Sequence, residues 1–184
     1  MVLYFVRHGQ TDFNKNSRLQ GVAFDEPLNA TGENEMRSLL PQLPKDFCVI
    51  FSSSLKRTLA SAKIIAAYSR REIIVTEKLT ERDFGTLAGR TWDDIPNGRS
   101  LQNMDRKQQY DYSPYGGESV RDVEERLMSF FDEAEGLGYS SAVVVSSIGV
   151  IRLAYKLLLN KTIIDIDNAS IHQFDLGFTA RLAA

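Results

Sequence analysis

Short apolar segments rich in β-branched residues alternate with amphipathic segments along most of the chain, and this alternation restricts the fold most strongly. Runs typical of strands occupy residues 2–6, 48–51, 73–75, 142–145 and 171–176. Helices are expected behind Thr31 as N-cap, behind the serines at 52–54, from Ser119, and over residues 149–159. Strands separated by helices form a mainly parallel sheet that is covered on both faces. We therefore expect an α/β protein built as a three-layer α/β/α sandwich.

Residues 82–117 interrupt this pattern, because glycine, proline, asparagine and aromatic residues dominate there. We expect a single domain over residues 1–184 with a cap-like insertion at about 91–117. The insertion allows two interpretations: its side chains hold an organic phosphate by charge and stacking, or it is a solvated excursion with its aromatic rings turned inward. The side chains concerned are Trp92, Arg99, Arg106, Lys107, Tyr110, Tyr112 and Tyr115.

The charge of the chain argues against two classes of partner. The formal net charge is -2, so neither nucleic acid nor an anionic membrane is expected as the main partner. No apolar run approaches the length of a membrane span, and the short apolar start is not typical of a signal peptide. The single cysteine, Cys48, excludes an internal disulfide, fits a reducing compartment and is expected in the core. We expect a cytoplasmic protein.

A histidine follows the first predicted strand, in the triplet Arg7-His8-Gly9. Neutral imidazole is a nucleophile near physiological pH, and a strand end holds it rigidly. The guanidinium of Arg7 suits phosphate oxygens, and Gly9 lets the backbone approach a ligand closely. By itself so short a motif favours a surface turn. However, Glu81 and Ser147 also follow predicted strands, and ligands of parallel sheets bind beyond the carboxyl ends of the strands.

Further segments complete an ordered series. They are Asn14, Arg18-Leu19-Gln20-Gly21, Asp25-Glu26-Pro27-Leu28-Asn29, Ser53-Ser54-Leu55-Lys56-Arg57, Leu79-Thr80-Glu81-Arg82-Asp83-Phe84-Gly85, Gly116-Gly117-Glu118-Ser119 and Val145-Ser146-Ser147-Ile148-Gly149. This series resembles the histidine phosphatase superfamily, the phosphoglycerate mutase-like family, from about Leu3 to Arg152. The resemblance implies a phosphohistidine intermediate, no metal and no other cofactor.

The resemblance also implies a role for each matching position. His8 would be the nucleophile, Arg7 and Arg57 would clamp the phosphoryl group, and Glu81 would be the general acid. Two guanidinium groups offset the charge of a phosphate monoester. A carboxyl group that an apolar, anion-rich site keeps protonated can give its proton to the leaving oxygen. The positions expected to bind substrate beside this centre are Asn14, Gln20, Gly21 and Gly149.

One position departs from the family's pattern. The family has a second histidine within Ser-His-Gly-Gly, where this chain has Ser146-Ser147-Ile148-Gly149. Ser147 offers one short neutral hydroxyl, and losing a preorganised donor costs on the order of a hundred- to a thousandfold in rate. Ile148 also departs, which favours natural divergence over a single engineered change. The other histidine, His172, lies in the last predicted strand, where we expect no catalytic part.

These observations predict a phosphatase that hydrolyses small organic phosphate monoesters through phosphohistidine on His8, with activity weakened at Ser147. Its partner would be a small phosphorylated metabolite. The chain is short for a phosphoglycerate mutase, which favours a phosphatase, and α-ribazole phosphatases are similar short members. An alternative from another class is a degenerate member that binds a phosphate ester or a protein without turnover. Ser147 and Ile148 favour that alternative, whereas the intact His8, Arg7, Arg57 and Glu81 oppose it.

Overall fold

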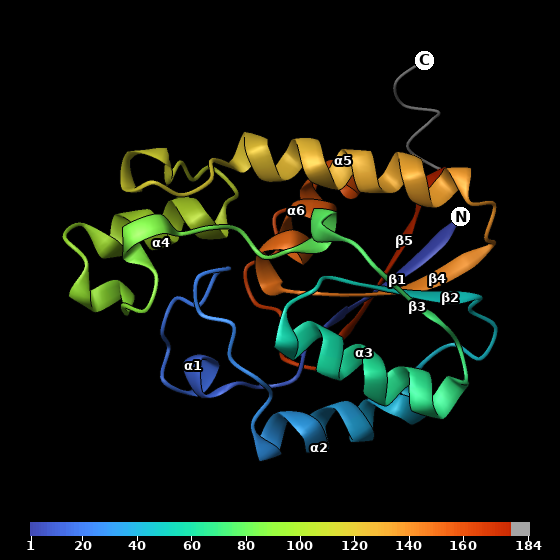
Figure 1. The fold of residues 1–184 in the computed structure, drawn as a ribbon. Coiled ribbons are helices and arrows are strands. Elements are labelled where there is room, and N and C mark those ends of the chain that lie inside the picture. Colours follow the sequence, from blue (N-terminus) through green and yellow to red (C-terminus); the bar gives the residue numbers. More distant parts are fainter. Residues whose placement is uncertain (178–184) are drawn as a thin grey trace.

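The computed structural model describes residues 1–177 and has a five-stranded sheet at its centre (Figure 1). The strands are β1 (Val2–Arg7), β2 (Val49–Ser52), β3 (Ile73–Val75), β4 (Ser141–Ser146) and β5 (Ile171–Asp175), in the order β3-β2-β4-β1-β5. β4 pairs in parallel with β1 and β2, and β2 pairs in parallel with β3. β5 pairs antiparallel with β1 at one edge. The prediction of a mainly parallel sheet is confirmed.

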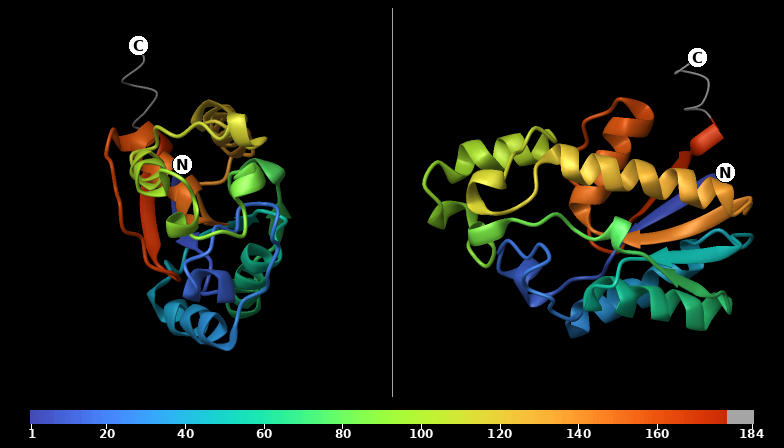
Figure 2. Two further views of the ribbon diagram at one scale, coloured as in Figure 1. Left: turned by 90° about the vertical axis from the view of Figure 1, so that its left-hand side faces the viewer. Right: turned by 45° about the horizontal axis from the view of Figure 1, so that its top comes forward.

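Helices cover both faces of the sheet (Figures 1 and 2). One face carries α2 (Ala30–Leu39) and α3 (Lys56–Ser69), and the other carries α5 (Val120–Gly136) and α6 (Ile148–Leu159). Alternate strand residues point to opposite faces, so Val144 packs with Leu127 of α5, whereas Val145 packs with Met36 of α2 and Ile65 of α3. The expected three layers are thus confirmed. Within residues 1–177, no helix is both long and apolar enough to cross a membrane.

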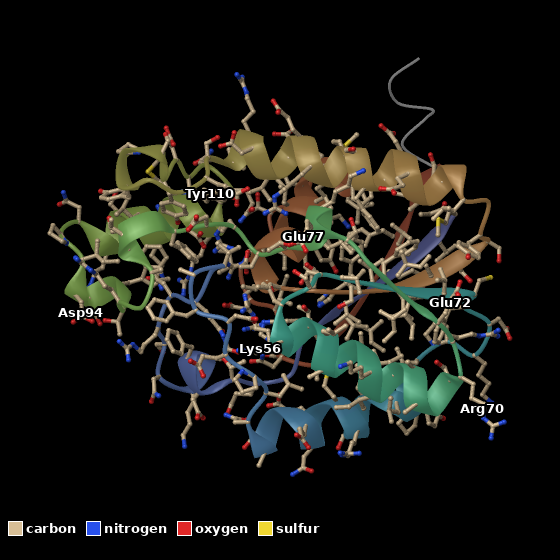
Figure 3. The ribbon with its side chains drawn as sticks, in the orientation of Figure 1. Lys56, Arg70, Glu72, Glu77, Asp94 and Tyr110 are labelled. Carbon is tan, nitrogen blue, oxygen red and sulfur yellow. The ribbon has the colours of Figure 1, made fainter. Side chains whose placement is uncertain are left out.

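The carboxyl ends of the parallel strands β1, β2 and β4 meet at one edge of the sheet, where α3 and α6 begin. Shorter elements surround this edge: α1 (Asp12–Lys15), η1 (Leu40–Gln42), η2 (Glu77–Leu79), η3 (Gly85–Leu87), η4 (Trp92–Asp94), α4 (Gly98–Arg106) and η5 (Ser113–Tyr115). The segment with η4, α4 and η5 lies beyond this edge, away from the N-terminus (Figures 1 and 2). Figure 3 shows Asp94 of this segment at one end of the molecule and Arg70 and Glu72 at the other.

Two helices begin differently from the sequence prediction. The N-cap of α2 is Asn29 rather than Thr31. The Asn29 side chain accepts from the Gly32 N–H, and the backbone N–H of Asn29 donates to the carbonyl of Gln10. No serine caps α3: its N-cap residue has no side-chain cap, and Ser53 instead bonds with the Thr58 hydroxyl at 2.6 Å. In both cases a tertiary or local hydrogen bond outweighs the simple preference for a capping residue.

Cys48 lies at the rim of the sheet rather than in the core. The strand begins one residue later, at Val49, and Cys48 is partly exposed. Its Sγ lies 3.4 Å from the Oγ of Ser140, the residue directly before β4. The prediction of a core cysteine is therefore wrong, because the apolar run starts before the strand does.

Candidate active site

A cavity of about 370 Å³ opens at the carboxyl ends of the parallel strands. It is lined from the end of β1, the loop around α1, the start of α3, the segment after η2, and the helices α4 and α6. Seven of the nine residues expected at the site line it: Arg7, His8, Asn14, Gln20, Gly21, Arg57 and Glu81. The folding of the sheet therefore brings together residues that are far apart along the chain.

His8 is buried and held in one tautomer. Its Nδ1 lies 2.7 Å from the carbonyl oxygen of Gly9, and a carbonyl only accepts, so Nδ1 carries the proton. The lone pair is then on Nε2. Burial and the charges of Arg57 and Arg7 hold the pKa of His8 well below its ordinary value. The imidazole is therefore neutral at physiological pH and presents a nucleophilic nitrogen.

Two arginines have buried N–H groups for which the described residues provide no hydrogen-bond acceptor. Arg57 is 1% exposed, and its Nη2 donates to the Gly21 carbonyl at 2.8 Å, whereas its Nε and Nη1 have no partner within residues 1–177. Arg7 donates from Nη1 to the Ile166 carbonyl, and its Nε is likewise without a partner there. Burial lowers the pKa of Arg7 to about 10, which still leaves it charged at neutral pH. Buried unpaired donors are costly, and these are arranged to hold an anion.

Glu81 is buried among donors. Its Oε1 accepts from the Arg82 backbone N–H at 2.9 Å and from Arg82 Nη1 at 2.7 Å, and its Oε2 accepts from the Gly149 N–H at 3.2 Å. Burial by itself would raise the pKa of Glu81. The charges of Arg82 and Arg57 and the two N–H groups together outweigh burial, so the pKa lies below its ordinary value. The expectation of a carboxyl kept protonated is thus wrong for the unliganded site, because arginines rather than anions surround it.

Two amide side chains, Asn14 and Gln20, line the cavity. Gln20 Oε1 accepts from the Thr11 hydroxyl at 3.1 Å, and Gln20 Nε2 is buried without a partner among the described residues. Asn14 Oδ1 accepts from the Thr11 N–H at 3.1 Å and from Asn168 Nδ2 at 3.3 Å. Gln20 is thus left with a buried donor for a ligand, and Asn14 is held through its oxygen within the loop that carries His8.

Ser147 and Gly149 do not lie on the cavity wall. Ser147 is the N-cap residue of α6, and its buried Oγ has no hydrogen-bond partner in the part of the chain described. Its neighbour Ile148 lines the cavity instead. Gly149 was expected to bind substrate, but its N–H donates to Glu81, and a Cβ there would overlap Arg82 Nη1 and Glu81 Oε1. The structure therefore places Gly149 behind the carboxylate.

Sequence reasoning missed several polar residues of the cavity wall, and four of them are charged or contact His8: Arg82, Asp105, Arg152 and Asn168. Arg82 stands next to Glu81, and this adjacency was the available signal. Asn168 Nδ2 donates to the His8 carbonyl at 3.0 Å, from a loop that precedes β5. Asp105 and Arg152 carried no such signal, because their partners are distant in sequence.

His172 lies in β5 and is not among the residues that line the cavity. Tyr155 Oη lies 2.9 Å from its Nδ1, and Ser170 Oγ lies 2.8 Å from its Nε2. Both ring nitrogens are thus occupied by hydroxyl groups. Over residues 1–177, no three His, Cys, Asp or Glu side chains gather in a way that could hold a metal ion.

Comparisons with known proteins place the sequence among phosphatases and mutases. The model of the histidine phosphatase superfamily (branch 1) matches residues 3–178. Fructose-2,6-bisphosphatase TIGAR B of Danio rerio is 35% identical over 134 residues, which cover 70% of this chain and 51% of that protein. The probable phosphoglycerate mutase GpmB of Photorhabdus laumondii is 31% identical over 153 residues, which cover 80% of this chain and 69% of that protein. The match thus spans about half of the first relative and about two thirds of the second.

Solved structures agree over nearly the whole chain. The crystal structure of phosphoglycerate mutase from Thermus thermophilus has a TM-score of 0.77 and 30% identity, and the match covers 96% of this chain and 94% of that chain. A mycobacterial hydrolase has a TM-score of 0.80 and 26% identity, with 94% and 90% covered. The similarity therefore includes the cap segment as well as the sheet.

Proposed function

The chain belongs to the histidine phosphatase superfamily, and from this premise we propose that it hydrolyses small organic phosphate monoesters through a phosphohistidine on His8. The observation that supports this most is the buried, neutral His8 beside Arg7 and Arg57. Within residues 1–177, both guanidinium groups keep donors without a partner, and both arginines line the same cavity. A nucleophile and a preformed site for three phosphoryl oxygens are the parts that the reaction requires.

The first step forms the phosphoenzyme. His8 Nε2 attacks phosphorus, the bond from phosphorus to the ester oxygen breaks, and that oxygen leaves as an alcohol after taking a proton. Arg7, Arg57 and Gln20 hold the phosphoryl oxygens in line with the ring through the donors that lack other partners. Because these donors are already in place, little reorganisation is needed when charge develops on the phosphoryl group.

Glu81 supplies the proton, although it is ionised before substrate binds. A phosphate monoester has a second pKa of about 6, so it can enter as the monoanion. Its negative charge beside Glu81 raises the pKa of that carboxyl, so the proton of the ester can pass to the carboxylate. Glu81 then gives that proton to the leaving oxygen. In the second step Glu81 takes a proton from water, the resulting hydroxide attacks phosphorus, and the bond to His8 Nε2 breaks to release phosphate.

The cavity wall favours a substrate with a second acidic group. It holds two carboxylates, Glu81 and Asp105, but more guanidinium groups: Arg7, Arg18, Arg57, Arg82, Arg106 and Arg152. The charge of Arg152 acts on Arg7, and the charge of Arg106 acts on Arg152, so this line of influence joins Arg7 at the phosphoryl site to Arg106 of α4. We propose that these arginines bind a carboxylate or second phosphate of a small metabolite. The name of the zebrafish relative likewise describes a sugar bisphosphate.

A second candidate function is phosphate-ester binding without turnover. It is favoured by Ser147, which is not among the residues that line the cavity, whereas its neighbour Ile148 is. The activity of an α-ribazole phosphatase or of a phosphoglycerate mutase is a further alternative within the family. We also propose a cytoplasmic location, for which the free thiol of Cys48 is the support.

A panel of phosphate esters tests the proposal. The unaltered protein and His8→Ala are assayed with a chelator present. Each is also incubated with an ester that is radiolabelled in its phosphoryl group and quenched in alkaline denaturant, which preserves phosphohistidine. We expect turnover and an acid-labile phosphoenzyme that both disappear in His8→Ala. Turnover that survives this substitution contradicts the proposal, as does activity that a chelator abolishes and a divalent metal restores. Binding of esters without any turnover would favour the second candidate.

A further inference from the structure

We propose that Asp105 of α4 is a positioning residue for Glu81 and acts through the guanidinium of Arg82. The inference rests on the proposed function and goes beyond it, because it assigns a part of the acid–base machinery to the cap segment. Asp105 is 23 positions from Arg82 along the chain, yet the Arg82 side chain joins its carboxylate to that of Glu81.

Arg82 connects the two carboxylates directly. It is 3% exposed, and its Nη1 donates to Glu81 Oε1 at 2.7 Å. Its Nε lies 2.8 Å and its Nη2 2.6 Å from Asp105 Oδ1. Both carboxylates raise the pKa of Arg82, against burial, so the bridge is cationic at any pH at which the protein works. An arginine so placed cannot change its hold on one carboxylate without changing its hold on the other.

Aromatic rings confine the bridging guanidinium. The Arg82 Cζ lies 4.7 Å from the centre of the Phe84 ring and 5.4 Å from that of Tyr110. Tyr110 in turn stacks on Tyr112, with ring centres 4.9 Å apart. Figure 3 labels Tyr110, which lies between α4 and the start of α5. These contacts favour one plane for the guanidinium, and hydrogen bonds must then set its direction within that plane.

Asp105 sets that direction because it is itself fixed. It is 3% exposed, its Oδ1 accepts from the Tyr112 hydroxyl at 2.8 Å, and its Oδ2 accepts from Arg152 Nη1 at 3.3 Å. Burial and the charge of Asp105 raise the pKa of Tyr112, so its hydroxyl stays a donor. If Asp105 became neutral, the Arg82 cation would be drawn towards Glu81 alone and would hold its proton-accepting oxygens more tightly.

The consequence is a link between substrate contact and proton transfer. Arg106, the next residue of α4, lines the cavity, as does Asp105, whose carboxylate pairs with Arg82. A substrate that engages α4 therefore acts on the same short helix that orients the acid. The link predicts that loss of the Asp105 charge slows the hydrolysis of an ester more when its leaving oxygen depends more on receiving a proton.

The test is the dependence of kcat/KM on the leaving group, because kcat/KM reports the steps up to His8 phosphorylation. Asp105→Asn is compared with the unaltered protein over phenyl phosphates of increasing phenol pKa and one alkyl phosphate. We expect kcat/KM for the alkyl ester to fall by about ten- to a hundredfold and that for 4-nitrophenyl phosphate by less than about threefold, since a good leaving group needs little acid catalysis. Asp93→Asn is the matched control, as Asp93 is an exposed carboxylate of the same cap segment. It should follow the unaltered protein.

Arg82→Lys provides a second, independent variant. Lysine keeps the charge but cannot bridge both carboxylates with a planar fork. It should steepen the leaving-group dependence as Asp105→Asn does, and the double variant should be little worse than either single one. If Asp105→Asn does not fold, as judged by thermal unfolding, Arg82→Lys carries the test. An equal fall for all esters, or no fall, overturns the positioning role while leaving the phosphatase intact. Turnover that persists in His8→Ala, or no turnover by the unaltered protein, rejects the proposed function and this inference together.

Discussion

The backbone N–H of Gly149 lies 3.2 Å from Glu81 Oε2, so the first turn of α6 holds the carboxylate that we propose as acid and base. The carboxylate is thereby fixed between α6 on one side and Arg82 on the other. The residue at 149 is close enough to both partners that a side chain has no room. This relationship gives the first prediction.

Gly149→Ala should lower both stability and activity. The added methyl group overlaps Arg82 Nη1 and Glu81 Oε1, and overpacking of this kind costs about 1–3 kcal/mol. Thermal or denaturant unfolding measures the loss, and kcat/KM for an alkyl phosphate measures the displacement of Glu81. Gly136→Ala is the control, because Gly136 is also helical but has nothing near its missing side chain. Gly136→Ala should raise the free energy of unfolding by about 0.5–1 kcal/mol. Equal changes in the two variants would contradict the close approach of Arg82 and Glu81 to position 149.

The fold was largely predictable because its signals are periodic and local. Each strand run and each amphipathic run corresponds to an element, and the parallel pairing follows from their alternation. The direction of β5 was not predictable, since it depends on how the loop after α6 returns along β1. Asn29 replaced Thr31 as N-cap for a similar reason: its contact with Gln10 is tertiary.

The site was predictable where its residues stand in recognisable short motifs. His8 follows β1, Arg57 lies in the first turn of α3, Glu81 follows η2, and the cavity joins them. The Arg82–Asp105 pair was hidden, because it forms only when α4 packs over the site. The ionised state of Glu81 was hidden as well, since it depends on the sum of burial and several arginine charges that no single motif carries.

The depressed pKa of His8 predicts a specific dependence of stability on pH. The ordinary value is 6.5, and burial followed by the charges of Arg57 and Arg7 keeps the folded value well below it. As pH falls below 6.5, the unfolded chain therefore binds a proton that the folded chain refuses, and stability falls until the folded pKa is reached. His8→Gln removes this contribution. The free energy of unfolding of the unaltered protein minus that of His8→Gln should therefore decrease on acidification from neutral pH.

That difference isolates His8 from His172, whose pKa burial also lowers but which both proteins keep. The same lowered pKa predicts that the His8 imidazole stays neutral at mildly acidic pH, so its protonation should not lower kcat/KM there. A constant stability difference over this range would mean that His8 titrates normally and is not held between the two arginines.

Arg106 is predicted to select substrates with a second acidic group. No hydrogen bond or ion pair within the described residues engages the Arg106 side chain, and it lines the cavity beside the charge of Arg152. Arg106→Gln should raise KM for 3-phosphoglycerate by about tenfold or more, the worth of one charge-assisted hydrogen bond. It should affect glycerol 3-phosphate, which lacks the carboxylate, much less. Arg99→Gln, an exposed arginine of the same helix, is the control, and equal effects on both esters would refute the subsite.

The last prediction concerns Ser147, which occupies the place of the family's second histidine. Its hydroxyl is buried, has no partner among residues 1–177 and is separated from the cavity wall, where Ile148 lies instead. The phosphoryl group thus lacks one donor, which corresponds to about 3–4 kcal/mol in the barrier if nothing replaces it. A histidine introduced at 147 must fit beside the branched side chain of Ile148, which lines the cavity. We therefore expect Ser147→His alone to raise kcat little, and Ser147→His with Ile148→Gly to raise it about ten- to a hundredfold.

The measurement is kcat for 4-nitrophenyl phosphate in the unaltered protein, both single variants and the double variant. Ile148→Gly alone separates the effect of added space from the effect of the ring, because it opens the wall without adding a donor. The ring can share positive charge with the phosphoryl oxygens only when protonated, so the gain in the double variant should shrink as pH rises above the ordinary histidine pKa of about 6.5. A double variant no faster than Ile148→Gly would show that Ser147 does not limit turnover. That result would favour the second candidate function, the binding of phosphate esters without turnover.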